Sequence, residues 1–395
     1  MKKLGLLPKL VLGILAGILF GKIGFIPLVR LFATFNGLFG NFLGFIIPLM
    51  IISFVAPGIA DLGKKANNLL LSTAALAYIS TIFAGLMAYF SGKALLPMVV
   101  KNFQLTSKEA VSISPYFSIE IPQIMGIMSA LILAFILGLG IANTAEKEKT
   151  LLNFLKDFQK IIEKVITFVI IPLIPVHISG IFARITAEGN LVSTIKSFSG
   201  IFFMILILQV VYILIQYTVA CSYSKKPYFT SIKNLLPAYF TAIGTQSSAA
   251  TIPVSIECSR ANKIDEDIID FVVPLCATIH LAGDTITLVL GSMGLLIATG
   301  VDPDFALMFP YILMLGVTMI AAPGIPGGGV MAALGLLENM LSLGQNQLAL
   351  MIALHFSQDS FGTATNVTGD GAIAIIINEK VKRTSATKSN KNTSS

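Results

Sequence analysis

Three aspartates lie inside apolar stretches of the second half of the chain, where charged side chains are unusual. They are Asp284, Asp359 and Asp370, and no lysine or arginine occurs from Ile264 to Asn378. A carboxylate at membrane depth costs roughly 3 kcal/mol on insertion scales, so it normally has a partner or a functional role. Because no basic side chain is nearby in the sequence, we expect the partner to be a cation from solution, an ammonium group or a proton.

The chain offers oxygen ligands around Asp370. The run from Asn366 to Asp370 places a carboxylate, an amide and several backbone carbonyls within little more than one helical turn. Hard cations such as Na⁺ are bound by oxygen ligands, and one carboxylate neutralises one positive charge. Asp359, Thr363 and Asn366 recur at helical spacing and so share one polar face. This face predicts a ligand site, although hydrogen bonds between packed helices would give the same pattern.

Ser247 and Ser248 lie where a second apolar segment is interrupted. Their hydroxyls and the free backbone N–H groups of a helix start suit a carboxylate. An ordinary turn would also carry such serines, so both interpretations stay open.

The histidines do not form a metal site by spacing. His177 and His355 stand singly in apolar helices and are expected to form packing hydrogen bonds. His280 precedes Asp284 by one helical turn, which leaves a proton relay open. No histidine–cysteine set has ligand spacing, and the Gly327–Gly329 run lacks the lysine and the strand of a phosphate loop. Without a nucleophile–base pair either, the sequence does not favour an enzyme.

The composition places these residues in a membrane. Of the 395 residues, 55% are hydrophobic and only 12% are charged, half of what a soluble domain carries. This excludes a cytosolic enzyme, a nucleic-acid binder and a disordered chain. The apolar segments do not alternate with polar residues, so an all-α multi-pass protein is predicted rather than a β-barrel. The length allows about eight transmembrane helices.

The net charge of +7 is concentrated between and beyond the apolar segments. Basic residues gather at the N-terminus, at Lys64-Lys65, at 225–233 and in the tail from Lys380 onward. This positive-inside bias predicts cytoplasmic N- and C-termini in a cell (plasma or inner) membrane, surrounded by lipid. The three cysteines, an odd number without a CxxC pair, do not indicate disulfides.

Apolar segments are predicted at 8–30, 32–60, 67–92, 121–143, 151–187, 192–222, 265–300 and 347–378. Two further segments, 230–262 and 307–345, are interrupted by glycine and proline and cannot run as single straight helices. Paired interruptions of this kind are typical of transporter binding sites, although kinked spans with loops would look similar. Residues 93–120 are expected to form an external loop, and 379–395 a disordered cytoplasmic tail.

Four ordered motifs resemble those of the dicarboxylate/amino acid:cation symporter family. Ser247–Pro253 resembles the serine-rich tip of its first hairpin, and Pro274–His280 resembles its Pro-Leu-Gly-Ala-Thr-Ile-Asn run. Gly324–Gly329 is similar to the Gly-Val-Pro-Gly-x-Gly of its second hairpin, and Asn366–Asp370 matches its Asn-Val-Thr-Gly-Asp. The resemblance covers nearly the whole chain and is most specific in the C-terminal half.

The resemblance implies eight transmembrane helices and two re-entrant helical hairpins in a homotrimer, with a transport domain that moves as an elevator against a scaffold domain. The implied division is 1–66 (scaffold helices 1–2), 67–120 (helix 3 of the transport domain and an external loop), 121–222 (scaffold helices 4–5 and helix 6 of the transport domain), 230–378 (transport core) and 379–395 (tail). No cofactor is implied besides the coupling ion, which is Na⁺ or H⁺.

The resemblance also implies roles for particular residues. Asp359 would bind the substrate ammonium, while Asn366 and Ser248 would bind its α-carboxylate. The remaining implied pocket residues are Gln246, Ser247, Asp284, Gly324, Ile325, Gly329, Gly362 and Thr363. One Na⁺ site would comprise Asp370 with the carbonyls of Cys276, His280 and Asn366, and a second the carbonyls of Thr278, Met319, Ile320 and Ala322.

Departures from the family pattern bear on ions and substrate. The family's Asn-Met-Asp-Gly-Thr reads His280 to Asp284 here, so the carboxylate of a third cation site is replaced by Ala282, as in the serine/threonine branch. The arginine that holds an acidic side chain in glutamate carriers aligns with Gly362, and the arginine of the first hairpin with Gln246.

The sequence therefore predicts a symporter that imports a neutral or cationic amino acid rather than an acidic one. Asp284 would repel a second carboxylate, and Gly362 leaves volume for a larger side chain. Asp284 itself could pair with a cationic side chain, serve as a displaced cation ligand or stay protonated. An H⁺-coupled carrier and a channel-like or sensory protein of the same fold remain alternatives.

Overall fold

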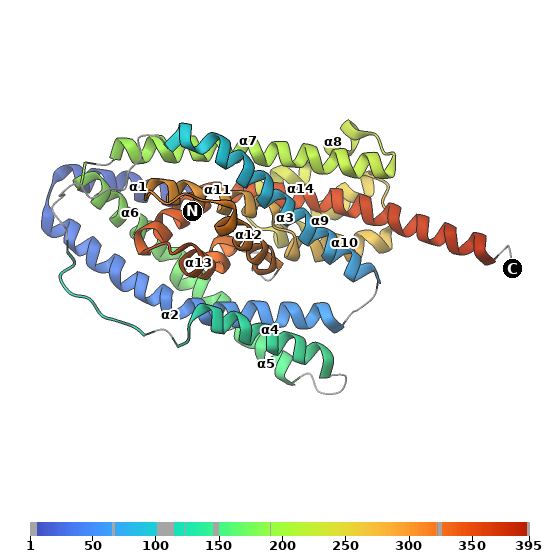
Figure 1. The fold of residues 1–395 in the computed structure, drawn as a ribbon, viewed down its shortest axis with the longest axis horizontal. Coiled ribbons are helices and arrows are strands. Elements are labelled where there is room, and N and C mark those ends of the chain that lie inside the picture. Colours follow the sequence, from blue (N-terminus) through green and yellow to red (C-terminus); the bar gives the residue numbers. More distant parts are fainter. Residues whose placement is uncertain are drawn as a thin grey trace, which may run out of the picture.

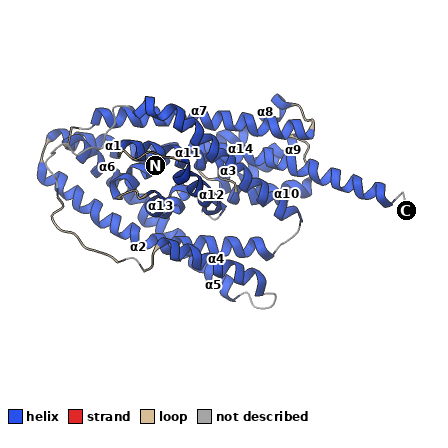
Figure 2. Cartoon of the chain, viewed as in Figure 1, coloured by secondary structure: helices blue, strands red, loops and turns tan. Residues whose placement is uncertain are grey.

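The computed structural model describes residues 6–64, 68–100, 114–122, 124–144, 150–189, 191–320, 322 and 326–392. Regular structure in these residues is entirely helical, as Figure 2 shows and as the sequence predicts. The elements are α1 (Leu6–Ile23), α2 (Ile26–Lys64), α3 (Asn68–Val100), α4 (Ile127–Thr144), α5 (Thr150–Val165), a π-helical turn (Ile166–Ile170), α6 (Ile171–Ala187), α7 (Leu191–Ser224), α8 (Tyr228–Thr245), α9 (Ser248–Ala261), α10 (Glu266–Ile279), α11 (Ala282–Ala298), α12 (Phe305–Ile320), α13 (Gly328–Leu341) and α14 (Gln345–Asn392).

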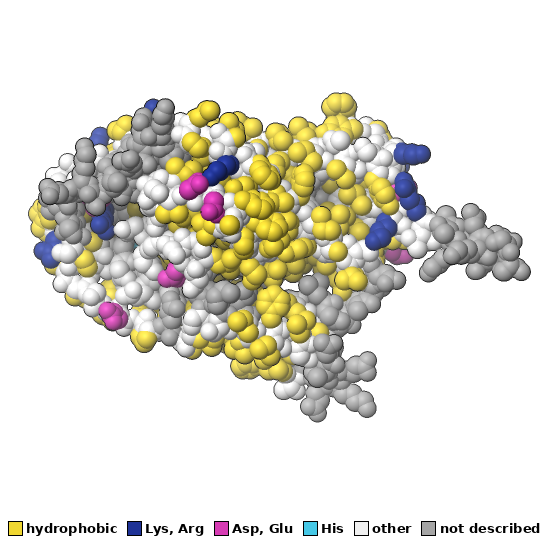
Figure 3. Space-filling view, in the orientation of Figure 1, with side chains coloured by type: hydrophobic (Ala, Val, Ile, Leu, Met, Phe, Trp, Pro, Cys, Tyr) yellow, Lys and Arg dark blue, Asp and Glu magenta, His cyan; other side chains and the backbone are white. Residues whose placement is uncertain are grey.

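The outer surface carries many large apolar side chains, which are coloured yellow in Figure 3. Leu19 on α1, Phe90 on α3 and Phe203 on α7 are each more than half exposed. Five helical stretches among the described residues are long and apolar enough to cross a membrane: Ile26–Ala60, Leu69–Val99, Thr150–Ala187, Thr194–Ser224 and Glu266–Ala298. Exposed apolar side chains on such helices are suited to lipid, in agreement with a multi-pass membrane protein.

The described helices pack in two groups (Figure 1). In one group α2 packs on α4, α5 and α6, and α1 packs on α6. In the other, α14 packs on α7, α8, α10 and α11, and α3 packs on α11 and α12. Contacts of α13 with α2 and of α14 with α6 join the groups. The grouping is compatible with the expected scaffold and transport domains, whose boundaries remain a prediction.

Small residues let α1 and α6 approach backbone to backbone. Gly13, Gly17 and Gly21 recur every four residues along α1. A Cβ added at Gly17 would stand 2.3 Å from the carbonyl oxygen of Ser179 on α6, and the other two glycines meet carbonyl oxygens of α6 equally closely. This spacing of small residues is the pattern that favours close helix packing in lipid.

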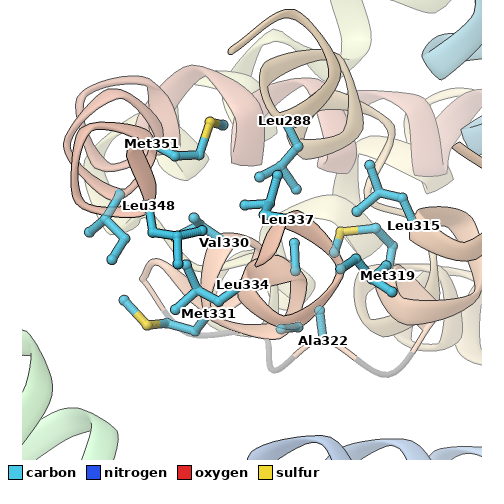
Figure 4. Packing of buried hydrophobic residues seen from close by; sticks show 14 of the residues in the cluster. Leu288, Leu315, Met319, Ala322, Val330, Met331, Leu334, Leu337, Leu348 and Met351 are labelled. Carbon is cyan, nitrogen blue, oxygen red and sulfur yellow. The ribbon is translucent and has the colours of Figure 1, made fainter. Parts of the chain in front are cut away.

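A buried apolar cluster supports the ends of α12 and α13 (Figure 4). It includes Leu315 and Met319 of α12, Val330 and Leu334 of α13, and Leu288 of α11. This packing holds the end of α12 against the start of α13. Residues 321 and 323–325 of that break, which include the expected pocket residues Gly324 and Ile325, lie outside the described residues.

The structure differs from the sequence expectations at three places. Helix α3 runs to Val100, so it takes up the first residues of the expected loop 93–120. The segment 151–187, predicted as one apolar segment, consists of α5 and α6 joined by the π-helical turn. The expected disordered tail continues α14 as a helix to Asn392. Contacts hold its beginning in place, because Arg383 lies 4.3 Å from the ring centre of Tyr223 and Lys382 pairs with Asp265 at 3.0 Å.

Candidate functional site

The break between α8 and α9 is tied to α14. Gln246 adopts a left-handed conformation with φ of 53°, which ends α8, and Ser247 caps α9 by accepting a hydrogen bond from the N–H of Ala250. The amide of Gln246 donates to the Ser360 hydroxyl at 2.8 Å. Ser248 begins α9 and is buried. The turn that the sequence marks by its serines therefore contacts the helix that carries the polar face.

The start of α13 meets the same helix. Gly327 precedes α13 with φ of 75°, and its N–H donates to Oδ2 of Asp359 at 2.9 Å. A Cβ at Gly327 would stand 2.0 Å from the ring of Phe356, so both the conformation and the close approach require glycine. Asp359 is thus held by the free backbone donor of a helix start. Thr363, one turn further along α14, is also buried.

Asp284 on α11 is held by two side chains of α14. Its Oδ1 accepts a hydrogen bond from Nε2 of His355 at 2.7 Å, and its Oδ2 accepts one from Nδ2 of Asn366 at 2.5 Å. The Asn366 oxygen in turn accepts from the N–H of Gly283 at 2.7 Å. All these groups are buried. One oxygen or nitrogen from each of Asp284, His355 and Asp359 lies within 4.8 Å of the other two, so two carboxylates and an imidazole form one cluster.

The space beside Asp284 is small. A Cβ added at Gly329 of α13 would stand 2.8 Å from Oδ1 of Asp284, which is closer than side chains normally approach. A Cβ at Gly362 would lie 3.7 Å from Oδ1 of Asp284 and from the amide nitrogen of Gln209, in ordinary contact. The Asp284 carboxylate therefore closes the space beside Gly329 but leaves room for a Cβ at Gly362.

His280 binds Asp370, not Asp284. Its Nδ1 lies 2.9 Å from Oδ1 of Asp370, and its Nε2 lies 2.9 Å from the Ser80 hydroxyl. The one-turn spacing to Asp284 does not apply, because α10 ends at Ile279 and α11 begins only at Ala282. The proton relay that the sequence left open between His280 and Asp284 is therefore wrong, because His280 is paired with Asp370 instead. His355, expected to make packing contacts only, is the histidine beside Asp284.

The polar contacts of His280 continue towards the outer helices. Ser80 of α3 lies 2.8 Å from the hydroxyl of Tyr212, and the amide of Gln216 on α7 donates to the Ser80 hydroxyl at 3.1 Å. Gln216 also lies 3.3 Å from Nε2 of His280. The Asp370 carboxylate is consequently one end of a largely buried polar chain that joins α14 to α3 and α7.

Several of the carbonyls expected to bind two sodium ions lie at the ends of helices, whereas Asn366 and Asp370 lie within α14. The carbonyl of Cys276 accepts the N–H of His280 at 2.9 Å, and Thr278 lies one residue before the end of α10. Met319 and Ile320 are the last residues of α12, and the N–H of Ala322 lies 3.4 Å from the Met319 oxygen. Carbonyls at helix ends have lone pairs free for a cation. The two ligand sets themselves remain a prediction.

Three further residues with expectations from the sequence are Ala282, His177 and His355. Ala282, which stands where a third carboxylate would be, is fully buried at the start of α11. His177 forms the expected packing hydrogen bond, with Nδ1 2.9 Å from the Asn36 side-chain oxygen. His355 is the site residue that sequence reasoning missed. Its position four residues before Asp359, on the same face of one helix, was the available signal.

Comparisons with known proteins identify the family of the chain. A model described as "Sodium:dicarboxylate symporter family" matches residues 6–380. A serine/threonine transporter SstT of Acinetobacter baylyi is 25% identical over 96% of this chain and 98% of its own. The protein of the same name from Streptococcus suis is 26% identical over 84% of this chain and 94% of its own. Excitatory amino acid transporter 1 of Ambystoma tigrinum is 27% identical over 61% of this chain and 44% of its own.

Proposed function

The chain belongs to the sodium:dicarboxylate symporter family, which makes it a cation-coupled membrane symporter and not an enzyme, and we propose that it imports a neutral or cationic amino acid together with Na⁺. The observation that carries the proposal is the convergence of three segments on α14. The α8–α9 turn meets Ser360, the start of α13 meets Asp359, and the start of α11 meets Asn366.

The charges of this face support the choice of substrate. Asp284 and Asp359 are both buried there, and the chain has no lysine or arginine between 264 and 378. An acidic amino acid would bring a second carboxylate next to two others without a cationic anchor, at a cost of several kcal/mol even at an effective dielectric near 20. A zwitterion or a cationic amino acid brings an ammonium group instead.

In the proposed complex, Asp359 binds the substrate ammonium. Asn366, together with the backbone and hydroxyl of Ser248 at the start of α9, binds the α-carboxylate, because both offer neutral hydrogen-bond donors. Gln246, Ser247, Gly329, Gly362 and Thr363 line the pocket, and Gly324 and Ile325 close it. Asp284 lies at the side-chain end of the site.

Two Na⁺ ions accompany the substrate in this proposal. Asp370 with the carbonyls of Cys276, His280 and Asn366 provides one site, and the carbonyls of Thr278, Met319, Ile320 and Ala322 the other. The α8–α9 and α12–α13 pairs act as re-entrant hairpins in a transport domain that moves as an elevator within a homotrimer, with both termini in the cytoplasm.

Counterflow in proteoliposomes tests the proposal. Vesicles preloaded with an unlabelled amino acid are diluted into the labelled compound, with and without Na⁺, for each common amino acid. We expect saturable, Na⁺-dependent uptake of one or more neutral or cationic amino acids and none of glutamate or aspartate. Failure of every amino acid, accompanied by a passive ion conductance, would favour the channel-like alternative.

One observation favours H⁺ as an alternative coupling ion. The Asp370 carboxylate, the only charged group proposed for the first Na⁺ site, already lies 2.9 Å from His280. Histidine is the side chain that most readily exchanges a proton near neutral pH. Uptake driven equally well by a proton gradient in the absence of Na⁺ would establish this alternative.

A further inference from the structure

The cluster of Asp284, His355 and Asp359 has an unusual charge balance. Both carboxylates and the imidazole are buried. The titratable groups beside Asp359 are His355 and Asp284, and within the described part of the chain neither carboxylate pairs with a lysine or arginine. Among the described residues, two carboxylates therefore share one buried site whose only basic group is a histidine.

The hydrogen bonds of His355 indicate that this histidine is neutral. Its Nε2–H donates to Asp284, while its Nδ1 is buried and has no hydrogen-bond partner among the described residues. An imidazolium would carry a second N–H at Nδ1, and a buried charged donor without an acceptor is more costly than an unpaired acceptor nitrogen. His355 thus orients the Asp284 carboxylate without neutralising it.

We propose, on the basis of the proposed amino acid transport, that the substrate carries a second ammonium group on a short side chain and that Asp284 binds it. Asp359 takes the α-ammonium and Asp284 the side-chain ammonium, so each buried carboxylate gains a counter-charge. The Asn366 amide and His355 hold the Asp284 carboxylate from α14.

The distances set the length of the side chain. The acceptor atoms of Asp284 and Asp359 belong to a group within 4.8 Å of one another, which suits two amines separated by two or three carbon atoms. Gly329 leaves little room beside Asp284, because an added Cβ there would stand 2.8 Å from its Oδ1, whereas an added Cβ at Gly362 would be in ordinary contact at 3.7 Å. A long lysine chain would have to fold back on itself to reach Asp284.

The test compares two compounds that differ in one group. 2,4-Diaminobutyrate and homoserine have the same length, but one ends in an amine and the other in a hydroxyl. Each competes with a labelled transported amino acid on the full-length protein in liposomes, at pH 7, where both amines are largely protonated. We expect diaminobutyrate to compete at least about tenfold more strongly than homoserine, and ornithine and lysine progressively less well.

Asp284→Asn removes the second charge and should reduce the diaminobutyrate-to-homoserine ratio at least about tenfold. Asp302→Asn, which changes an exposed carboxylate paired with Lys93, is the matched control and should leave the ratio unchanged. The wild-type ratio requires no variant, so it decides the question even if Asp284→Asn does not fold.

The outcomes separate this inference from the function it depends on. Equal competition by homoserine, or a ratio unaffected by Asp284→Asn in folded protein, overturns the inference while leaving amino acid transport intact. So does a change in Na⁺ dependence without a change in the ratio, because Asp284 would then be a cation ligand. Failure of every amino acid to be transported contradicts the proposed function itself.

Discussion

Nδ1 of His280 and Oδ1 of Asp370 lie 2.9 Å apart, and neither side chain is more than 2% exposed. The histidine comes from the broken segment between α10 and α11, and the aspartate from the middle of α14. A cation that binds the Asp370 carboxylate therefore has to share the carboxylate with the His280 imidazole or displace that imidazole. This competition makes ion dependence the most direct property to measure.

Asp370→Asn should weaken Na⁺-dependent uptake at least about tenfold, because even indirect partners of metal ligands typically contribute that much. The measurement is the Na⁺ concentration at half-maximal uptake in proteoliposomes. Asp267→Asn, an exposed residue in the first turn of α10, is the control and should retain the wild-type value. An unchanged Na⁺ dependence in Asp370→Asn would exclude this carboxylate as a ligand.

His280→Asn should raise the apparent Na⁺ affinity about tenfold, because it removes a hydrogen bond of roughly 1.5 kcal/mol to the charged Asp370. Asparagine is also the residue that the family motif carries at this place. Na⁺ titrations of uptake compare the variant with the wild type. If H⁺ is the coupling ion, the same variant should lose gradient-driven uptake instead, so the two coupling schemes predict opposite results.

Gly329→Ala should abolish or strongly reduce substrate binding. The new methyl group would stand 2.8 Å from Oδ1 of Asp284, and overpacking of this kind costs about 1–3 kcal/mol. Gly244→Ala is the matched control, because an added Cβ there meets nothing within 4 Å. Binding is measured by ligand-induced thermal stabilisation in detergent. If Gly329→Ala binds substrate as well as the wild type does, the residues around Gly329 must move to accommodate the added methyl group.

Gly17→Val should separate α1 from α6 and lower the thermal stability of the purified protein. Its Cβ would stand 2.3 Å from the Ser179 carbonyl oxygen, and the rigid backbone of α6 cannot move aside as a flexible side chain would. Leu19→Val changes an exposed side chain of the same helix and serves as the control. Equal melting temperatures for the two variants would contradict the close packing.

The sequence predicted the all-helical class and much of the polar site because those features depend on local pattern. Asp359, Thr363 and Asn366 lie on one uninterrupted helix, so their spacing describes their arrangement in space. His280 and Asp284 are separated by a helix break, so the same reasoning assigned His280 the wrong partner. The bond between His355 and Asp284 joins residues 71 positions apart, and no periodicity within one segment indicates such a contact.

The length and continuity of α14 have a mechanical consequence. The helix that carries Asp359, Asn366 and Asp370 runs on without a break to Asn392. At 1.5 Å per residue, its end lies about 33 Å from Asp370 along one stiff rod. A tilt of the helix about its binding residues is thus carried outward as a larger displacement of the terminus. A fluorophore attached to that end of the helix would report movement of the binding residues without contacting them.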